Sequence, residues 1–200
     1  MNNVRAQVGW GFWLRWVSAF WLWWVLASTV GLAVGGRVAF AVGRAVAVAV
    51  EEAVGGAVGF AVYEEAAGFA VSAVVGRAVA VAVSGAVVGA SVGIAQWLVL
   101  QRQVSRPGWW VLASTVGLAV GGVVAVAVSG AVVGASVGIA QWLVLRRWQV
   151  ARAGWWVLAS TVGLAVAFDV TVEETVGFAV YGAITGGVLV WLLRQPSREA

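Results

Sequence analysis

The chain has 200 residues, of which 62% are hydrophobic and 10% are charged, and it contains 27 glycines. Soluble proteins are about 45–50% apolar and about 25% charged. With a mean hydropathy of +0.98, this chain therefore lacks the polar residues needed to cover a soluble globule. Because it has no cysteine, a disulfide-stabilised secreted domain is excluded as well. The composition indicates a multi-span α-helical membrane protein.

Residue types that carry common chemistry are missing. The chain has no histidine and no cysteine, which are the usual ligands of zinc and iron–sulfur clusters, and histidine is also the commonest general base. We therefore expect neither an enzyme nor a metal site. The 12 basic residues are all arginines and give a net charge of +4. Most of them lie beside tryptophans at the ends of apolar runs, which predicts a membrane-facing flank and no nucleic-acid surface.

Internal repeats organise the chain. The segment WWVLASTVGLAV begins at Trp23, Trp109 and Trp155. The segment 79–100, which ends in Gln-Trp-Leu-Val-Leu, recurs unchanged at 124–145. The middle copy of both together, 109–145, is an apolar run of 37 residues, too long for one helix in a hydrocarbon core of about 30 Å. We therefore predict an all-α, polytopic membrane protein built of repeated helical hairpins.

The elements follow in chain order. Residues 1–22 are rich in tryptophan and contain Arg15, which predicts an N-terminal interfacial helix. Residues 23–100 form the first hairpin, 109–145 the second, 155–193 the third, and 194–200 a C-terminal tail. In the third hairpin Asp169, Glu173 and Glu174 lie halfway along, where a turn is needed. Three hairpins give six spans.

The first hairpin carries a long insert, 37–83, in which charges interrupt the apolar runs. A charge at the bilayer centre costs about 2.5–3.5 kcal/mol. Two interpretations remain: a single long hairpin with arms beyond the membrane and its tip near 51–65, or an extra pair of spans that buries Glu51 and Glu52 against Arg77. We favour the first, with six spans; the second gives eight. The insert also contains VGRAVAVAV twice, from Val42 and from Val75.

Arginine predicts the orientation. The hairpins place nine arginines on one side, which the positive-inside rule makes cytoplasmic together with both termini. Seven of the eight acids, all except Glu199, then lie toward the other side. We predict a multi-pass protein of the bacterial inner membrane. The expected anchors at the cytoplasmic interface are Trp97, Trp109, Trp110, Trp142, Trp155, Trp156, Trp191, Arg102, Arg106, Arg146 and Arg147.

Glycines recur four residues apart, a spacing that places them on one helix face and lets a neighbouring backbone approach closely. We interpret them as helix-packing positions of a glycine zipper, serving contacts inside a hairpin or, alternatively, contacts with other subunits. The candidate packing residues are Gly85, Gly89, Gly93, Gly117, Gly121, Gly130, Gly134, Gly138, Gly182 and Gly186.

Gln96 and Gln141 are polar residues about one turn inside the arginine flank. We expect them to reach headgroups and water, with an interhelical hydrogen bond or the polar group of a cofactor as alternatives. The hydroxyls of Ser114 and Thr115, and of their repeat copies, are expected to bond the carbonyl one turn earlier. The paired glutamates are expected to lie at solvated hairpin tips.

The string GASVGIAQWLVLRR, followed by QVARAGWWVLASTVGLAV, resembles the Trp- and Gly-rich, internally repeated multi-span membrane proteins of phototrophic bacteria. The similarity covers most of the chain outside the insert 37–83. It implies a helical membrane fold and transfers no catalytic residue.

Three functions compete. The first is a non-catalytic structural or assembly subunit that packs, by glycine-lined helix faces, in a larger membrane complex, photosynthetic or respiratory. The second is an accessory protein that binds a carotenoid, a chlorophyll-type pigment or a quinone, although the sequence indicates no cofactor directly. The third is a channel or transporter. The expected partners are the lipid bilayer and other membrane protein subunits.

Overall fold

The computed structural model describes residues 10–61, 65–101, 108–125, 130–168 and 173–194, and for 10–14, 16, 57–61, 65–70, 125 and 174 it describes the backbone alone. Within these ranges the chain is all-helical, as predicted. The helices are α1 (Trp10–Ala61), α2 (Glu65–Leu100), α3 (Gly108–Ala125), α4 (Gly130–Arg147), α5 (Gly154–Ala167) and α6 (Glu174–Leu193).

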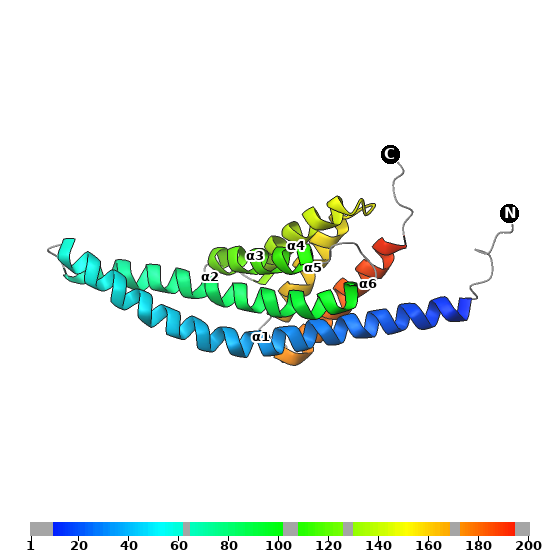
Figure 1. The fold of residues 1–200 in the computed structure, drawn as a ribbon, viewed down its shortest axis with the longest axis horizontal. Coiled ribbons are helices and arrows are strands. Elements are labelled where there is room, and N and C mark those ends of the chain that lie inside the picture. Colours follow the sequence, from blue (N-terminus) through cyan, green and yellow to red (C-terminus); the bar gives the residue numbers. More distant parts are fainter. Residues whose placement is uncertain (1–9, 62–64, 102–107, 126–129, 169–172, 195–200) are drawn as a thin grey trace.

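The six helices form a closed ring in chain order. Each described helix contacts the helix before it and the helix after it, and α6 returns to contact α1. Since successive helices run in opposite directions, the start of α1 and the end of α6 lie at the same end of the molecule (Figure 1). We call this the arginine end, because Arg146 and Arg147 end α4 there and Arg152 and Arg194 lie beside α5 and α6.

Three helices are long and apolar enough to cross a membrane, namely the segments Val17–Gly56, Val71–Leu100 and Thr175–Leu193. The apolar stretches Gly108–Val124 and Gly154–Ala167 are shorter. With 14 residues, α5 is about 21 Å long, less than the roughly 30 Å of a hydrocarbon core. Length and composition thus support a membrane protein most strongly for α1, α2 and α6.

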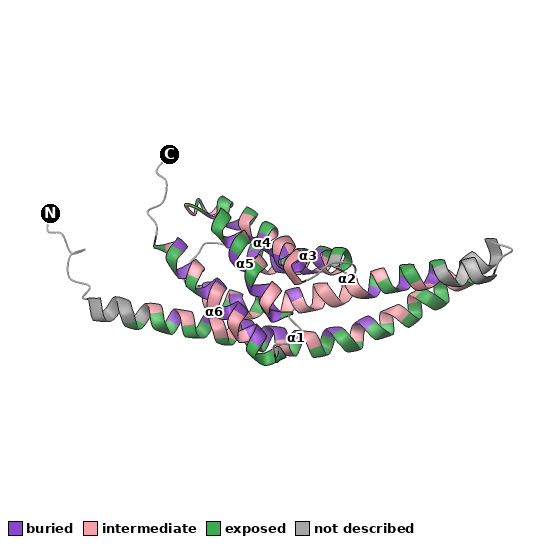
Figure 2. Ribbon diagram, turned by 180° about the vertical axis from the view of Figure 1, so that it is seen from behind, coloured by how far each residue is buried: buried purple, intermediate pink, exposed green. Residues whose placement is uncertain are grey.

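The two longest helices extend past the ring. At 52 and 36 residues, α1 and α2 are about 78 and 54 Å long, and they continue beyond α3–α6 as a two-helix arm (Figure 2). The insert 37–83 contains this arm, and its described residues belong to α1 and α2 without an additional helix. The expected boundary after residue 22 is also absent, since α1 continues from Trp10 through it.

The turn between α4 and α5 is fixed by its backbone. Gln149 has φ of 56°, the left-handed conformation that commonly ends a helix. The amide of Val150 donates to the carbonyl of Leu145 at 3.0 Å, and that of Gln149 donates to Arg146 at 2.9 Å. These are the two hydrogen bonds of a Schellman motif. Arg152, with φ of 57°, then directs the chain into α5.

Candidate functional site

Three tryptophans meet inside the ring at the arginine end. Trp24 of α1, Trp110 of α3 and Trp156 of α5 each have no exposed surface. Their rings pack edge to face, with centroids 5.9 Å apart for Trp24–Trp110, 6.0 Å for Trp24–Trp156 and 5.3 Å for Trp110–Trp156. Such pairs stabilise beyond the area they bury, by about 0.5–1.5 kcal/mol each. Because α1, α3 and α5 are not neighbours in the ring, this triad fills its centre.

The repeats explain the triad, since each member is the second tryptophan of a WWVLAS segment. The first members face outward: Trp23 is 62% exposed, Trp109 45% and Trp155 54%. Adjacent residues on a helix point about 100° apart, so one indole faces outward and the other faces the core. This corrects the sequence expectation for Trp110 and Trp156, which lie in the core and not at an interface.

A glutamine links the triad to two helices. The indole Nε1 of Trp110 donates to Oε1 of Gln96 at 2.8 Å, and Nε2 of Gln96 donates to Oγ of Ser28 at 3.0 Å. Gln96 lies on α2 and has no exposed surface, so it joins α3 to α1. Both polar atoms of its amide are used, which leaves headgroups and water out of reach.

The second repeat reproduces this link. Nε1 of Trp156 donates to Oε1 of Gln141 at 2.8 Å, and Nε2 of Gln141 donates to Oγ of Ser114 at 2.8 Å. The Ser114 hydroxyl donates in turn to the carbonyl of Trp110 at 2.8 Å. Gln141 is fully buried on α4 and joins α5 to α3. Of the alternatives left open by the sequence, the structure shows the interhelical hydrogen bond for both glutamines.

The third link is shorter. Nε1 of Trp24 donates to Oγ1 of Thr185 at 3.1 Å, and Thr185 donates to the carbonyl of Tyr181 at 2.8 Å. Thr185 has no amide group that could donate to Ser160, and Oγ of Ser160 is buried without a hydrogen-bond partner among the described residues. The ring therefore repeats the indole hydrogen bond three times. The bond to a serine hydroxyl is found in two of the three links.

Neither Thr185 nor the acceptor role of Ser28 and Ser114 was predicted from the sequence. A signal for the serines was present, because every WWVLAS segment places a serine four residues after the buried tryptophan, on the same helix face. The predicted bonds to the preceding turn are found for Thr29, Ser114, Thr115 and Thr161, and the prediction is wrong for Ser160, whose hydroxyl has no partner among the described residues. Oγ1 of Thr115 donates to Val111 at 2.8 Å, and that of Thr161 donates to Val157 at 2.7 Å.

Glycines bring the helices of the ring together. Within the second hairpin, a β-carbon added to Gly117 would lie 2.7 Å from Cα of Val137, and within the first, one on Gly31 would lie 2.8 Å from Cα of Val92. Between hairpins, β-carbons on Gly89 and Gly134 would collide with the carbonyls of Ser114 and Ser160. A larger residue would separate these backbones.

The remaining predicted glycines lie at similar approaches, between α2 and α3, α3 and α4, α4 and α5, or α6 and α1. Those between hairpins face other helices of the same chain. The glycines concerned are Gly85, Gly93, Gly121, Gly130, Gly138, Gly182 and Gly186.

Arginines stack on outward tryptophans at the arginine end. The guanidinium of Arg146 lies 4.8 Å from the ring centre of Trp142, and that of Arg147 lies 5.5 Å from Trp109. Arg152 lies 6.0 Å from the ring of Trp191, which is 36% exposed. Cation–π pairs of this kind suit a membrane–water boundary. Trp97 is half-buried, and Arg102 and Arg106 lie outside the described residues.

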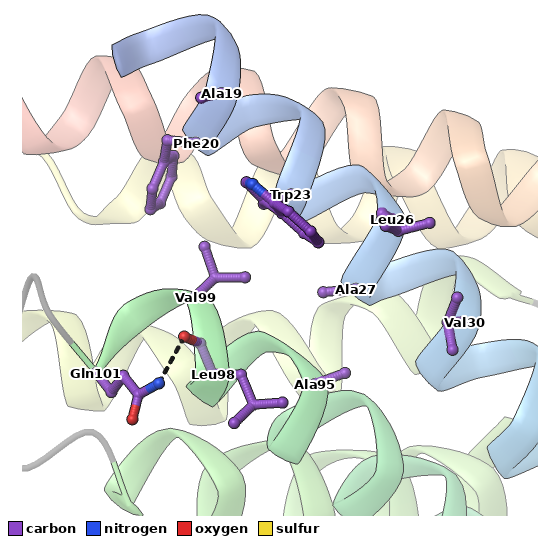
Figure 3. A pocket seen from close by; sticks show the side chains of 10 residues that line it. All are labelled: Ala19, Phe20, Trp23, Leu26, Ala27, Val30, Ala95, Leu98, Val99 and Gln101. Carbon is purple, nitrogen blue, oxygen red and sulfur yellow. Dashed lines mark hydrogen bonds between the residues drawn. The ribbon is translucent and has the colours of Figure 1, made fainter.

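An apolar groove of about 610 Å³ opens on the outer face between α1 and α2 (Figure 3). Phe20, Trp23 and Leu26 form one wall, and Leu98 and Val99 form the other. Part of this groove belongs to the first hairpin alone. The helix α1 begins at Trp10, well before its tryptophan pair, and so includes Phe20, whereas α3 and α5 begin just before their tryptophan pairs.

A second pocket, of about 720 Å³, lies where the arm meets the far ends of α3, α4 and α5. Leu118, Val133 and Phe168 line its apolar side, and Arg44 and Arg77 lie on the arm side. Within the described residues, no three His, Cys, Asp or Glu side chains lie together as metal ligands would.

Comparison with protein families, with curated proteins and with solved structures gave no match in any of the three. Functional inference therefore rests on the geometry alone.

Proposed function

We propose that the chain is an integral membrane protein in which three glycine-packed hairpins form a closed ring of six spans, and that it serves as a non-catalytic structural subunit. The observation that carries this proposal is the polarity of the ring. Its outer face carries large apolar side chains, while Ser28, Gln96, Ser114 and Gln141 are buried inside. Water would favour the reverse arrangement, whereas lipid favours apolar residues outside and paired polar groups inside.

The outward apolar side chains belong to every helix of the ring. Exposed examples are Leu26 and Val30 of α1, Leu98 of α2, Leu112 and Val116 of α3, Leu143 of α4, Leu158 and Val162 of α5, and Val176 of α6.

In this proposal the arginine end faces the cytoplasm of a bacterial cell and the arm projects from the opposite side of the inner membrane. Single cysteines at Ala151 and Glu52, introduced into this cysteine-free chain, test the orientation. An impermeant thiol reagent on intact cells should label Glu52→Cys and leave Ala151→Cys unlabelled until the cells are opened. Labelling of both, or release of the chain by alkaline carbonate, would contradict the proposal.

The arm supports a structural role. Outside the span of α3–α6 it carries Val48 at 51% exposure and Val74 at 70%, and apolar patches in water mark contacts with other molecules. We propose that this arm contacts a partner subunit of a larger complex. Since the glycine faces between hairpins are occupied by the chain's own helices, the arm replaces them as the assembly surface.

Purification from the native membrane in mild detergent, after crosslinking, tests the assembly role. The wild type and Glu52→Gln, an arm variant that retains the apolar surface, should retain the same partner, and Val48→Ser/Val74→Ser should lose it. A wild-type chain that is always recovered as a lone monomer would contradict a structural subunit.

A second candidate function is supported by the groove between α1 and α2. A carotenoid or a quinone tail would lie along its apolar walls against Trp23. Gln96 and Gln141 would take no part, because their amides are already bonded. An organic extract of the purified protein that contains stoichiometric carotenoid or quinone, lost in Ala95→Trp and retained in Ala41→Trp on the arm, would support this role. An extract without either would contradict it.

A further inference from the structure

The pocket at the base of the arm combines an apolar floor with two arginines. Leu118 of α3, Val133 of α4 and Phe168 after α5 line one side, and Arg44 of α1 and Arg77 of α2 line the other. Neither guanidinium has a hydrogen bond or ion pair with another described residue. Beyond the level of these arginines the described charges of the arm, Glu51 and Glu52, are acidic. The difference in charge between the two ends of the molecule therefore does not explain the paired arginines.

The duplicated VGRAVAVAV segment accounts for the pairing. It places Gly43–Arg44 on α1 and Gly76–Arg77 on α2. A β-carbon on Gly43 would lie 3.3 Å from the carbonyl of Ala80, and one on Gly76 would lie 3.3 Å from the carbonyl of Ala47. The two copies thus cross as an antiparallel pair, with each glycine against the other helix. In this register Arg44 is level with residue 79, about 3 Å along the axis from Arg77.

The arginines lie at a distinct depth. Arg44 follows the buried Trp24 by 20 residues, and Arg77 precedes the buried Gln96 by 19. At 1.5 Å per residue both lie about 30 Å from the tryptophan layer. If the tryptophan layer marks one side of the hydrocarbon core, as the proposed function requires, the arginine pair lies at the headgroup level of the opposite leaflet.

Charge defines the ligand. Arg44 and Arg77 contribute two positive charges and Glu51, which also lines the pocket, contributes one negative charge, leaving one net positive charge. Arginine binds phosphate oxygens in a planar, two-pronged geometry. The pocket therefore matches a singly charged phosphodiester that carries an apolar tail.

We propose that this pocket binds one anionic phospholipid of the phosphatidylglycerol type, with its phosphate between Arg44 and Arg77 and an acyl chain against Leu118, Val133 and Phe168. The inference rests on the proposed membrane location. The bound lipid would bridge the base of the arm and the far ends of α3, α4 and α5.

Native mass spectrometry of the full chain, released from nanodiscs of phosphatidylcholine with added phosphatidylglycerol or phosphatidylethanolamine, tests this assignment. The wild type should retain one phosphatidylglycerol. Arg44→Gln/Arg77→Gln should bind it about thirtyfold more weakly, since two basic contacts at a membrane surface are lost. Arg37→Gln is the control and should bind as the wild type does, because Arg37 is an exposed arginine of α1 about two turns nearer the tryptophan layer and outside the pocket. Glu51→Gln should bind phosphatidylglycerol more tightly.

Circular dichroism and gel filtration of Arg44→Gln/Arg77→Gln show whether a loss of lipid reflects the pocket or unfolding. If that variant is unstable, Arg44→Lys/Arg77→Lys, which keeps both charges, should restore part of the binding. Equal retention of phosphatidylethanolamine, an equal loss in Arg37→Gln, or displacement of the lipid by millimolar inorganic phosphate would overturn the assignment. A chain released by carbonate would overturn the proposed function itself, whereas an integral chain without lipid preference would overturn this inference alone.

Discussion

The indole Nε1 of Trp110 donates a 2.8 Å hydrogen bond to Oε1 of Gln96, and both side chains are fully buried. The bond joins the first hairpin to the second, and its copy from Trp156 to Gln141 joins the second to the third. Small residues bring the helices close, and the buried bonds then fix their rotation. In lipid, where burial of apolar surface does not hold helices together, these contacts must supply much of the ring's cohesion.

Replacing Trp110 with phenylalanine should destabilise the ring. The change removes the indole that donates to Gln96, so an amide oxygen stays buried without that partner, at a cost of about 1–3 kcal/mol. Trp109→Phe alters the neighbouring, 45% exposed ring and is the matched control, expected near wild type. Unfolding by SDS in mixed micelles, followed by circular dichroism, measures both. Equal stability of the two variants would argue against the buried bond.

The repeats provide a comparison between identical positions. Ser114→Ala removes the acceptor of Gln141 Nε2 and should cost about 1–3 kcal/mol. Ser160→Ala removes a buried hydroxyl that has no partner among the described residues, so it should be neutral or stabilising. The same SDS titration ranks the two. If Ser160→Ala proved the more damaging substitution, the asymmetry of the ring would be wrong.

Close approach at the glycines can be tested with a single methyl group. A β-carbon at Gly89 would collide with the carbonyl of Ser114, whereas nothing lies within 4 Å of one at Gly36. Gly89→Ala should therefore destabilise by about 1–3 kcal/mol through overpacking. Gly36→Ala should be neutral or stabilise by up to about 1 kcal/mol, because alanine favours the helix. Thermal denaturation in detergent distinguishes them, and a neutral Gly89→Ala would mean that α2 and α3 lie farther apart.

Composition and repeats predicted the helical class and the three hairpins, because those depend on local hydrophobicity and on length. They could not separate the two tryptophans of each pair. Trp109 and Trp110 are chemically identical neighbours, and only closure of the ring decides that Trp110 faces inward. For the same reason Gln96 looked interfacial, since its partner Ser28 is 68 residues away in sequence. The insert 37–83 could be interpreted as one long hairpin or as an extra pair of spans, because the length of a helix does not show which part of it packs against other helices.

The start of α6 provides a pH-dependent prediction. Glu173 occupies the N-cap, and its carboxylate accepts a hydrogen bond from the amide of Val176 at 3.1 Å. Hydrogen bonds from the backbone of Val176, then from the backbone and side chain of Thr175, lower the pKa of this carboxyl below its ordinary value of 4.5. Because these bonds favour the charged form, and a negative charge also suits a helix N-terminus, the cap is strongest when Glu173 is ionised.

The folded-state pKa of Glu173 lies below its unfolded value, so the stabilisation is fully present above about pH 4.5 and is lost as the pH falls through the lower, folded pKa. Carbon-13 NMR of glutamate-labelled protein in micelles should show one carboxyl that titrates below 4.5 and that disappears in Glu173→Gln. That variant keeps an acceptor oxygen but cannot titrate, so its α6 amide exchange should lack the acid-dependent increase expected of the wild type near Thr175 and Val176. A Glu173 carboxyl that titrates at or above 4.5 would show that the cap does not form in the membrane-mimetic state.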